Sequence, residues 1–513
     1  MSQGLSDAMP ITVWNPTAGL FSNTSKTLIP DTGCSACANV IGYEGKLRPR
    51  PGFTETLSTL GSGVSVFHYT RLEQLTGVIT RAALSWNTTT NAVKLWERTG
   101  ATWADRTGAA ALTGAETVHP TSASFKGALY FTTGDNNLYK WAGPAVNIAE
   151  VTNADPTLTP YTVPRIVRAW DGRLWNFNVV DGTRVPYRVA WSDLLVDNVW
   201  RAGVNGGSSG YQDLVDGSTD DLEPITAAID TRDAMVAFKT NTIYLGAFTD
   251  YPKWYEFRKL TRGIGCISQA SIARFRESVL FLADDNVYAL QGNQVQPVGD
   301  DKIRTRMRAA VALSAMGRSV GIVDPYNELY WLFVPKVGTT TMITLFIFSF
   351  RDSGTWWEGE ITNTGILPVC SYGYRESTWD HTLTVGSRDG KFYKIDSAAT
   401  TDNNTAFTPS WTSKQWDIMQ LTRGKDPVES LKIQKIAVHA QSGKITMQVR
   451  TGPTLDDLTT ETIGTLTFNG KSDRYLALRQ GDRFAELILT WVMSSVAQVE
   501  GFTMHVLPRG PIR

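Results

Sequence analysis

Two cysteines near the start of the chain have a spacing at which two side chains could do chemistry together. Cys34 and Cys37 form Cys-x-x-Cys, a spacing found in zinc sites and in redox-active dithiols. A zinc site needs further ligands, and the sequence offers no second Cys-x-x-Cys and no His-x-x-x-His. A redox dithiol opens a helix after a strand, whereas no helical pattern follows Cys37. We therefore interpret the pair as two ordinary thiols in a loop, and we expect no metal and no cofactor.

Hydrolase motifs occur only in incomplete form. The segment 206–210 spells Gly-x-Ser-x-Gly, but it lies in a Gly-Ser loop rather than between a buried strand and a helix. The turn around Asp352 resembles the Asp-box of sialidase propellers, but Ser349 and Trp356 are each one residue out of register. The sequence identifies no catalytic residue, so we expect a protein that is not an enzyme. A glycosidase, which needs two carboxylates about 5–10 Å apart, stays open as the alternative.

A first basic cluster lies in a proline-containing run near the N-terminus. Lys46, Arg48 and Arg50 alternate with other residues there, and Pro49 and Pro51 favour an extended backbone. Such an arm suits docking on an adjacent subunit or an adaptor, because prolines lower the entropy cost of ordering it. We therefore expect that replacing Arg48 and Arg50 by Ala weakens assembly and leaves the melting temperature nearly unchanged.

A second basic cluster belongs to the best helix candidate, from Lys302 to Met316, which we expect Asp300 or Asp301 to cap. The expected apolar face consists of Ile303, Met307, Ala310 and Val311. The basic residues Lys302, Arg304, Arg306 and Arg308 would contact DNA or a neighbouring chain, or form a solvated face.

The segments around these residues repeat along the chain. Leu84, Leu129 and Leu174, each 45 residues after the last, begin similar strand–turn–strand units rich in aromatic residues. Related units continue to about residue 400 with a more variable spacing. A lone hairpin cannot bury its apolar face, whereas small antiparallel sheets packed around an axis can. The pattern predicts an all-β fold with a β-propeller of six to eight blades; a string of β-sandwiches is the alternative.

The flanking segments differ from the repeats. Residues 1–60 are rich in Gly, Pro, Ser and Thr and predict an extended N-terminal arm, followed by the propeller over 61–400. Residues 410–513 alternate apolar and polar residues without the repeat pattern, which predicts a C-terminal β-sandwich.

Composition restricts the function classes. Lys plus Arg and Asp plus Glu both number 49 in 513 residues, so a globally basic nucleic-acid binder is excluded. The sequence shows no apolar run long enough to span a bilayer and no signal peptide at its start. Four cysteines are too few for a disulfide framework. We expect the chain to fold in a reducing cytoplasm.

Several short motifs taken together resemble a known family. They are the segments 39–53, 171–175, 188–193, 238–244, 263–268 and 300–303. Their order is similar to that in the tail hub or nozzle proteins of short-tailed bacteriophages, in particular those of the packaged-DNA stabilisation group.

The resemblance implies a virion protein assembled in the host cytoplasm, forming a ring of six subunits below the portal and adaptor proteins. It implies tail fibres or tailspikes at the side and a channel in which double-stranded DNA makes transient, non-specific contacts. It implies no catalytic residues. Two other functions stay open: a carbohydrate-binding or glycosidase tail component built on a propeller, and a propeller that only scaffolds protein partners.

Overall fold

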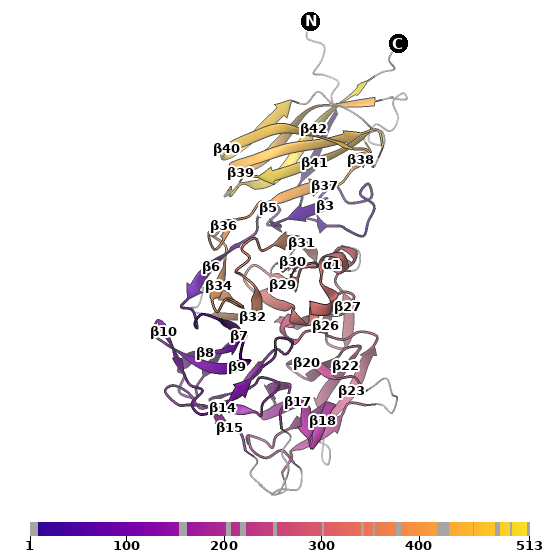
Figure 1. The fold of residues 1–513 in the computed structure, drawn as a ribbon. Helices are drawn as coiled ribbons and strands as arrows, with labels where there is room; N and C mark the ends of the chain where they lie inside the picture. The colour runs from indigo at the N-terminus through magenta and orange to yellow at the C-terminus, as the bar shows by residue number, and fades with distance from the viewer. Residues whose placement is uncertain are drawn as a thin grey trace.

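The computed structural model describes residues 9–152, 162–201, 207–215, 222–249, 254–299, 302–339, 343–351, 354–375, 381–417, 430–454, 456–477, 483–492 and 495–509. Its secondary structure consists almost entirely of strands, which form a propeller at one end of the molecule and a large curved sheet at the other (Figure 1). In the described part of the chain, no helix has the length and apolar character needed to cross a membrane.

Six blades of the propeller are antiparallel sheets built from consecutive strands. Blade 1 consists of β7 (Val64–Glu73), β8 (Ile79–Asn87), β9 (Ala92–Thr99) and β10 (Thr102–Asp105), with β11 (Leu112–Thr113) paired to β9. Blade 2 consists of β12 (Thr121–Phe125), β13 (Ala128–Thr132), β14 (Tyr139–Trp141) and β15 (Ala149–Glu150). Blade 3 consists of β16 (Ile166–Trp170), β17 (Arg173–Asp181), β18 (Thr183–Trp191) and β19 (Gly210–Asp213).

The next three blades follow the same plan. Blade 4 consists of β20 (Ile225–Asp230), β21 (Met235–Lys239), β22 (Thr242–Phe248) and β23 (Tyr255–Arg262). Blade 5 consists of β24 (Ala273–Phe275), β25 (Ser278–Leu282), β26 (Val287–Gln291) and β27 (Gln294–Pro297). Blade 6 consists of β28 (Val320–Asp324), β29 (Leu329–Pro335), β30 (Ile343–Ser349) and β31 (Thr355–Glu360).

The seventh blade combines strands from both ends of the repeat region. It contains β32 (Pro368–Arg375), β33 (His381–Ser387) and β34 (Phe392–Asp396), with β6 (Gly52–Leu57), β35 (Thr401–Asp402) and β36 (Thr405–Ala406). Strand β6 pairs antiparallel with β34, so that Phe53 faces Ile395 in the ladder. A strand that precedes blade 1 in the sequence thereby closes the ring. The propeller has seven blades, which confirms the expectation of six to eight.

The strand pattern of the sequence follows from blade packing. Leu84, Leu129 and Leu174 lie at corresponding places, in the second strands β8, β13 and β17, and all three are buried. In β13 and β21 every residue is buried. A blade is covered by a neighbour on each face, so its second strand reads as a continuous apolar run rather than an alternating one.

The curved sheet has eleven strands and is nearly closed into a barrel. Its C-terminal strands are β37 (Ser410–Ser413), β38 (Trp416–Asp417), β39 (Ser430–Gly452), β40 (Thr459–Ala477), β41 (Phe484–Trp491) and β42 (Gln498–Arg509). Its N-terminal strands are β1 (Met9–Trp14), β2 (Gly19–Leu20), β3 (Gly33–Ala38), β4 (Val40–Tyr43) and β5 (Lys46–Pro49). The N-terminal segment is extended, but it pairs within its own chain: β1 and β5 both bond to β42.

The predicted helix is shorter than expected. Helix α1 spans Arg304–Ala310 and is followed by the 3₁₀ helix η3 (Leu313–Arg318). Val311 ends α1 because its backbone is extended and bridges Lys336. Ile303 and Met307 are buried, as the apolar face predicts. Ile303 occupies the N-cap position without a side-chain bond, and the expected caps Asp300 and Asp301 lie outside the described residues.

Candidate functional site

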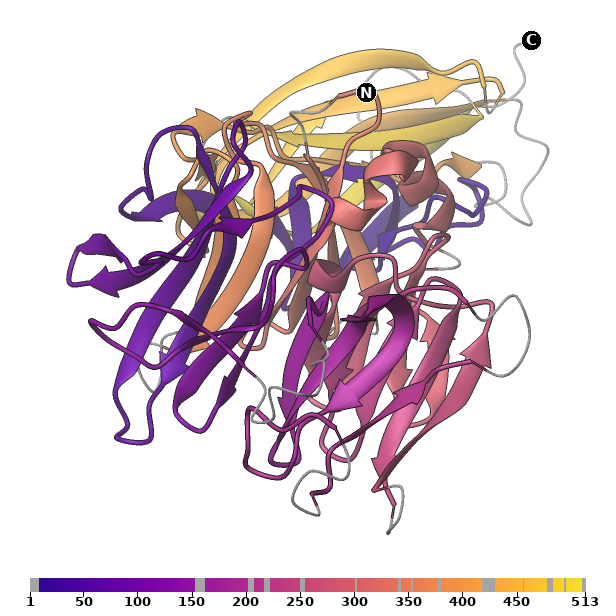
Figure 2. The ribbon, with the colours of Figure 1, turned by 60° about the horizontal axis from the view of Figure 1, so that its bottom comes forward.

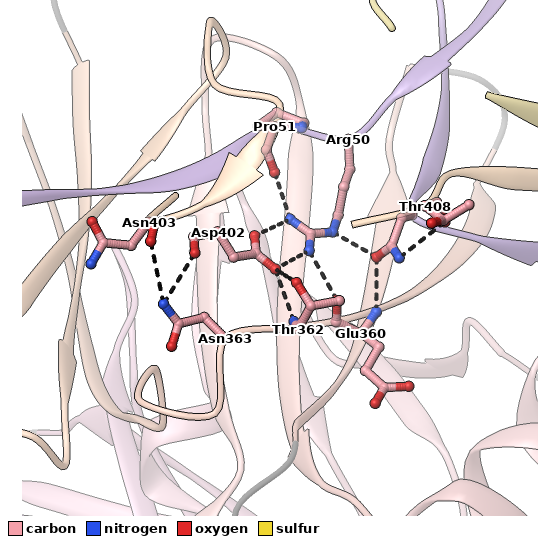
Figure 3. Close-up of polar contacts among 9 residues, drawn as sticks. Arg50, Pro51, Glu360, Thr362, Asn363, Asp402, Asn403 and Thr408 are labelled. Carbon is pink, nitrogen blue, oxygen red and sulfur yellow. Dashed lines mark hydrogen bonds and ion pairs between the residues drawn. The ribbon is translucent and has the colours of Figure 1, made fainter. Parts of the chain in front are cut away.

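Arg50 forms a buried clamp between the propeller and the curved sheet (Figure 3). Its Nη1 and Nη2 donate to the two carboxylate oxygens of Asp402, at 3.0 and 2.8 Å. The same nitrogens donate to the carbonyls of Pro51 and Glu360, and Nε donates to Asn39 Oδ1. All five N–H groups of the guanidinium are thus bonded, which is the condition for burying an arginine at tolerable cost.

The clamp connects segments that are distant in sequence. Thr362 donates to Asp402 from both its backbone N–H and its hydroxyl, so the carboxylate also holds the loop after blade 6. The ring of Phe407 stacks against the guanidinium at 4.0 Å. Arg50 is therefore not available to DNA or to another chain. The expectation that Arg50 contacts DNA or a neighbouring chain is therefore wrong. Its guanidinium is buried and forms its hydrogen bonds with groups of its own chain instead of with solvent or a partner.

The other two residues of the first basic cluster lie closer to the surface. Lys46 forms an ion pair with Glu500 at 3.2 Å. The guanidinium of Arg48 lies over the ring of Tyr43 at 3.9 Å, and burial lowers the pKa of this arginine. Its Nε and Nη2 have no hydrogen-bond partner among the described residues. The three cations thus face three different environments and do not form one contact surface.

Most of the second basic cluster is also engaged within the chain. Lys302 donates to the carbonyl of Gly354, Arg304 pairs with Asp285 at 2.9 Å, and Arg306 pairs with Glu358 at 2.8 Å. Arg308 is exposed and forms no ion pair with any described residue. Of the four cations, Arg308 is the one whose placement suits contact with a partner.

The Cys-x-x-Cys pair lies on strand β3 rather than in a loop. Both thiols are buried and free, and Cys34 donates to the carbonyl of Gly19. Burial raises the pKa of Cys34 well above its ordinary value. Within the described ranges, no group of His, Cys, Asp and Glu is arranged to hold a metal ion.

The innermost strands of the propeller leave cavities along its axis. One cavity of about 150 Å³ is lined by His68 of β7, His119 before β12, Arg168 of β16, Gln269 of the 3₁₀ helix η2 (Gln269–Ser271) and Ser371 of β32. A second of about 200 Å³ shares His119 and Gln269 with the first, and a third of about 260 Å³ shares His119. The three cavities therefore meet around His119.

Both histidines form a hydrogen bond to a protein oxygen through Nε2. The Ser122 hydroxyl donates its proton to a hydrogen bond with Thr70. Its oxygen therefore accepts a hydrogen bond from the Nε2–H of His68, at an N···O distance of 2.9 Å. His119 Nε2 donates to the carbonyl of Gly317 at 2.8 Å. Burial, with smaller effects of Arg168 and His119, lowers the pKa of His68 to about 3. Burial likewise lowers the pKa of His119.

A carboxylate lies at the edge of the largest of these cavities. Glu116 accepts from Arg388 at 2.9 Å and from Arg318 at 3.1 Å. No other Asp or Glu lines this cavity within the part of the chain that the structure describes. The cavity thus combines one paired carboxylate with hydrogen-bonding and apolar side chains.

The sequence analysis missed the axial cavity. A weak signal was present in the repeats: the first strands of blades 1, 2 and 3 each contain a polar residue near this axis, namely His68, Ser122 and Arg168, although β7 and β12 contain other polar residues as well. Polar residues on innermost strands point to a shared axis, but this inference requires the blades to be aligned strand by strand.

Comparisons with known proteins find no matching family and only distant structural likenesses. No family model and no curated protein matches the chain. Among solved structures, YCF48 bound to D1 peptide is 11% identical, covers 68% of this chain and 99% of its own, and has a TM-score of 0.39. YCF48 from Cyanidioschyzon merolae is 13% identical, with coverages of 67% and 98% and a TM-score of 0.37. An ancestral GH74 enzyme is 10% identical, with coverages of 72% and 51% and a TM-score of 0.32.

These likenesses bear on two expectations. The neighbouring structures include YCF48, PorZ and glycoside hydrolases, and none of these is a phage tail hub protein. Glycoside hydrolases are among them, and this overturns the expectation that the protein is not an enzyme.

Proposed function

We propose that the protein is a hub or nozzle of a short bacteriophage tail, which forms a ring below the portal and adaptor and conducts DNA during ejection. The motif resemblance of segments 39–53 and 171–303 motivates this proposal. The Arg50–Asp402 clamp is the observation that carries it. A part that joins a portal to a host surface must keep a fixed angle between its two ends, and the clamp holds the propeller against the curved sheet.

Exposed apolar side chains offer a surface for neighbouring subunits. Leu194, Leu195, Tyr211, Leu222 and Phe248 all come from blades 3 and 4 or the segments beside them, and each is more than half exposed. Scattered apolar residues are ordinary on a surface, but a concentration in two adjacent blades favours contact with another chain.

Electron microscopy of the purified full chain tests the hub proposal. Negative staining and sedimentation are run on the chain alone and after mixing with the portal–adaptor ring of the same phage. We expect a ring with an axial hole on the portal. Leu195→Asp should weaken the ring, whereas Leu28→Asp, at an exposed site in the N-terminal region, should not. A chain that stays monomeric with and without the portal ring would refute the proposal.

A second candidate function is carbohydrate binding or glycoside hydrolysis in a tail component. The axial cavities favour it, since donors and acceptors from several blades converge on a space of small-molecule size. Hydrolysis by the usual mechanism requires a second carboxylate beside Glu116. A screen for binding of host-surface polysaccharides, followed by a reducing-end assay on any that bind, separates the two activities. Glu116→Gln should abolish hydrolysis if this cavity is the active site.

A further inference from the structure

The axial cavity contains an arginine without a carboxylate partner. Arg168 Nε donates to the carbonyl of Ala228 at 2.8 Å, and Nη1 makes a long bond of 3.4 Å to the carbonyl of Val167. No described residue forms an ion pair with Arg168, and Nη2 has no bond to any described residue. Asp230, at the end of β20, attracts the charge from a greater distance. Arg168 is half-buried, and burial lowers its pKa.

The surroundings of Arg168 do not neutralise its charge. Besides Arg168, the titratable groups that line the same cavity are His68, His119 and Cys370. Burial lowers the pKa of both histidines and raises the pKa of Cys370, which favours the uncharged form of all three at neutral pH, and Arg318 adds positive charge near His119. The remaining lining is apolar or neutral and includes Gln269 and Ser371. Placing a cation in a partly buried, mostly neutral space costs free energy unless an anion accompanies it.

We propose that this cavity binds a small oxyanion, either phosphate or a short carboxylate, through the guanidinium of Arg168. A guanidinium fork matches the paired oxygens of either group. The volume of about 150 Å³ is about five times the roughly 30 Å³ that one water molecule occupies in the liquid, which suits a ligand of a few heavy atoms. Gln269 and Ser371 line the same space and supply further polar groups. The proposal does not depend on the hub function.

Ligand-dependent stability of the full chain tests this inference. The melting temperature is measured in sodium phosphate, sulfate and acetate, each against sodium chloride of equal ionic strength. We expect a rise of about one to three degrees at 10 mM phosphate or acetate in the natural protein. The rise should be absent in Arg168→Gln and retained in Arg232→Gln, which removes an exposed arginine of blade 4.

Isothermal titration calorimetry of the natural protein and Arg168→Lys provides the second measurement, because Arg168→Gln is at risk of misfolding. Lysine keeps the charge but loses the fork, so we expect at least a tenfold weaker affinity for phosphate. A response to phosphate but not to acetate would identify the ligand as a phosphate group, and the reverse would identify a carboxylate. Equal binding by all variants, or no binding of any anion by the natural protein, would overturn the proposal and leave a cavity filled by water.

Discussion

The guanidinium of Arg50 forms two parallel hydrogen bonds with the carboxylate of Asp402, which lies 352 residues later in the sequence. Both side chains are fully buried. The pair lies where the chain passes from the curved sheet, through β5, into the closing strand β6 of the propeller. One ion pair therefore fixes the place where the two parts of the molecule join (Figure 3).

Breaking this pair should be costly. Arg50→Met leaves Asp402 buried without its main partner, so we expect the free energy of unfolding to fall by about 3–5 kcal/mol. Urea unfolding followed by tryptophan fluorescence measures this loss. Lys391→Met, which breaks an exposed pair with Glu55 of β6, should cost less than about 1 kcal/mol.

A double variant separates the charge from the packing. Arg50→Met combined with Asp402→Leu removes both charges, and we expect it to be more stable than Arg50→Met alone. If Arg50→Met unfolds at the same urea concentration as the natural protein, the clamp does not hold the two parts together.

Ring closure by β6 predicts a second sensitive position. Phe53 of β6 is fully buried, and truncation to Ala should cost about 3–5 kcal/mol through the cavity that it leaves. Phe248→Ala makes the same chemical change at a side chain that is 56% exposed, so its cost should stay below about 1 kcal/mol. Thermal unfolding of both variants checks the difference. Equal melting temperatures would show that β6 contributes little to closing the ring.

Local sequence pattern was sufficient to predict the propeller. The equal spacing of Leu84, Leu129 and Leu174 reflects a repeated strand position, which Figure 2 shows as successive blades around the axis. Period-two alternation and polar turns are properties of neighbouring residues, so a single sequence reveals them. The same local signals place strands near the C-terminus.

Pairings between distant segments were beyond that reasoning. The run from Lys46 to Pro51 looks exposed because it is rich in charge and proline, yet Arg50 is buried by residues more than 300 positions away. The axial cavity depends in the same way on side chains from blades 1, 3 and 7, such as His68, Arg168 and Ser371. No short stretch of neighbouring residues indicates either the burial of Arg50 or the axial cavity.

The cysteines should be inert in the folded protein. All four are buried, and burial raises the pKa of both Cys266 and Cys370 to about 12. Since the thiolate is the reactive form, we expect no rapid reaction with Ellman's reagent at pH 8 and four reactive thiols in guanidinium chloride. Two fast thiols in the native protein would instead identify Cys34 and Cys37 as an accessible dithiol.

His68 should make stability depend on pH in mildly acidic solution. Its folded pKa of about 3 lies below the ordinary value of 6.5, so between these values the unfolded chain binds a proton that the folded chain does not. Stability is therefore lost as the pH falls through this window, by at most about 1.4 kcal/mol per pH unit for this residue. Urea unfolding at pH 7, 6, 5 and 4 measures the slope.

Two variants assign that slope to His68. His68→Gln keeps a side-chain N–H for Ser122 but cannot titrate, so its stability should fall less steeply with acid than that of the natural protein. Ser371→Ala alters the same cavity without removing a titrating group, so it should shift the whole curve and leave its slope unchanged. A slope identical in His68→Gln and the natural protein would mean that His68 gains its proton equally in the folded and unfolded states, and that the cavity is open enough to solvate a charged imidazole.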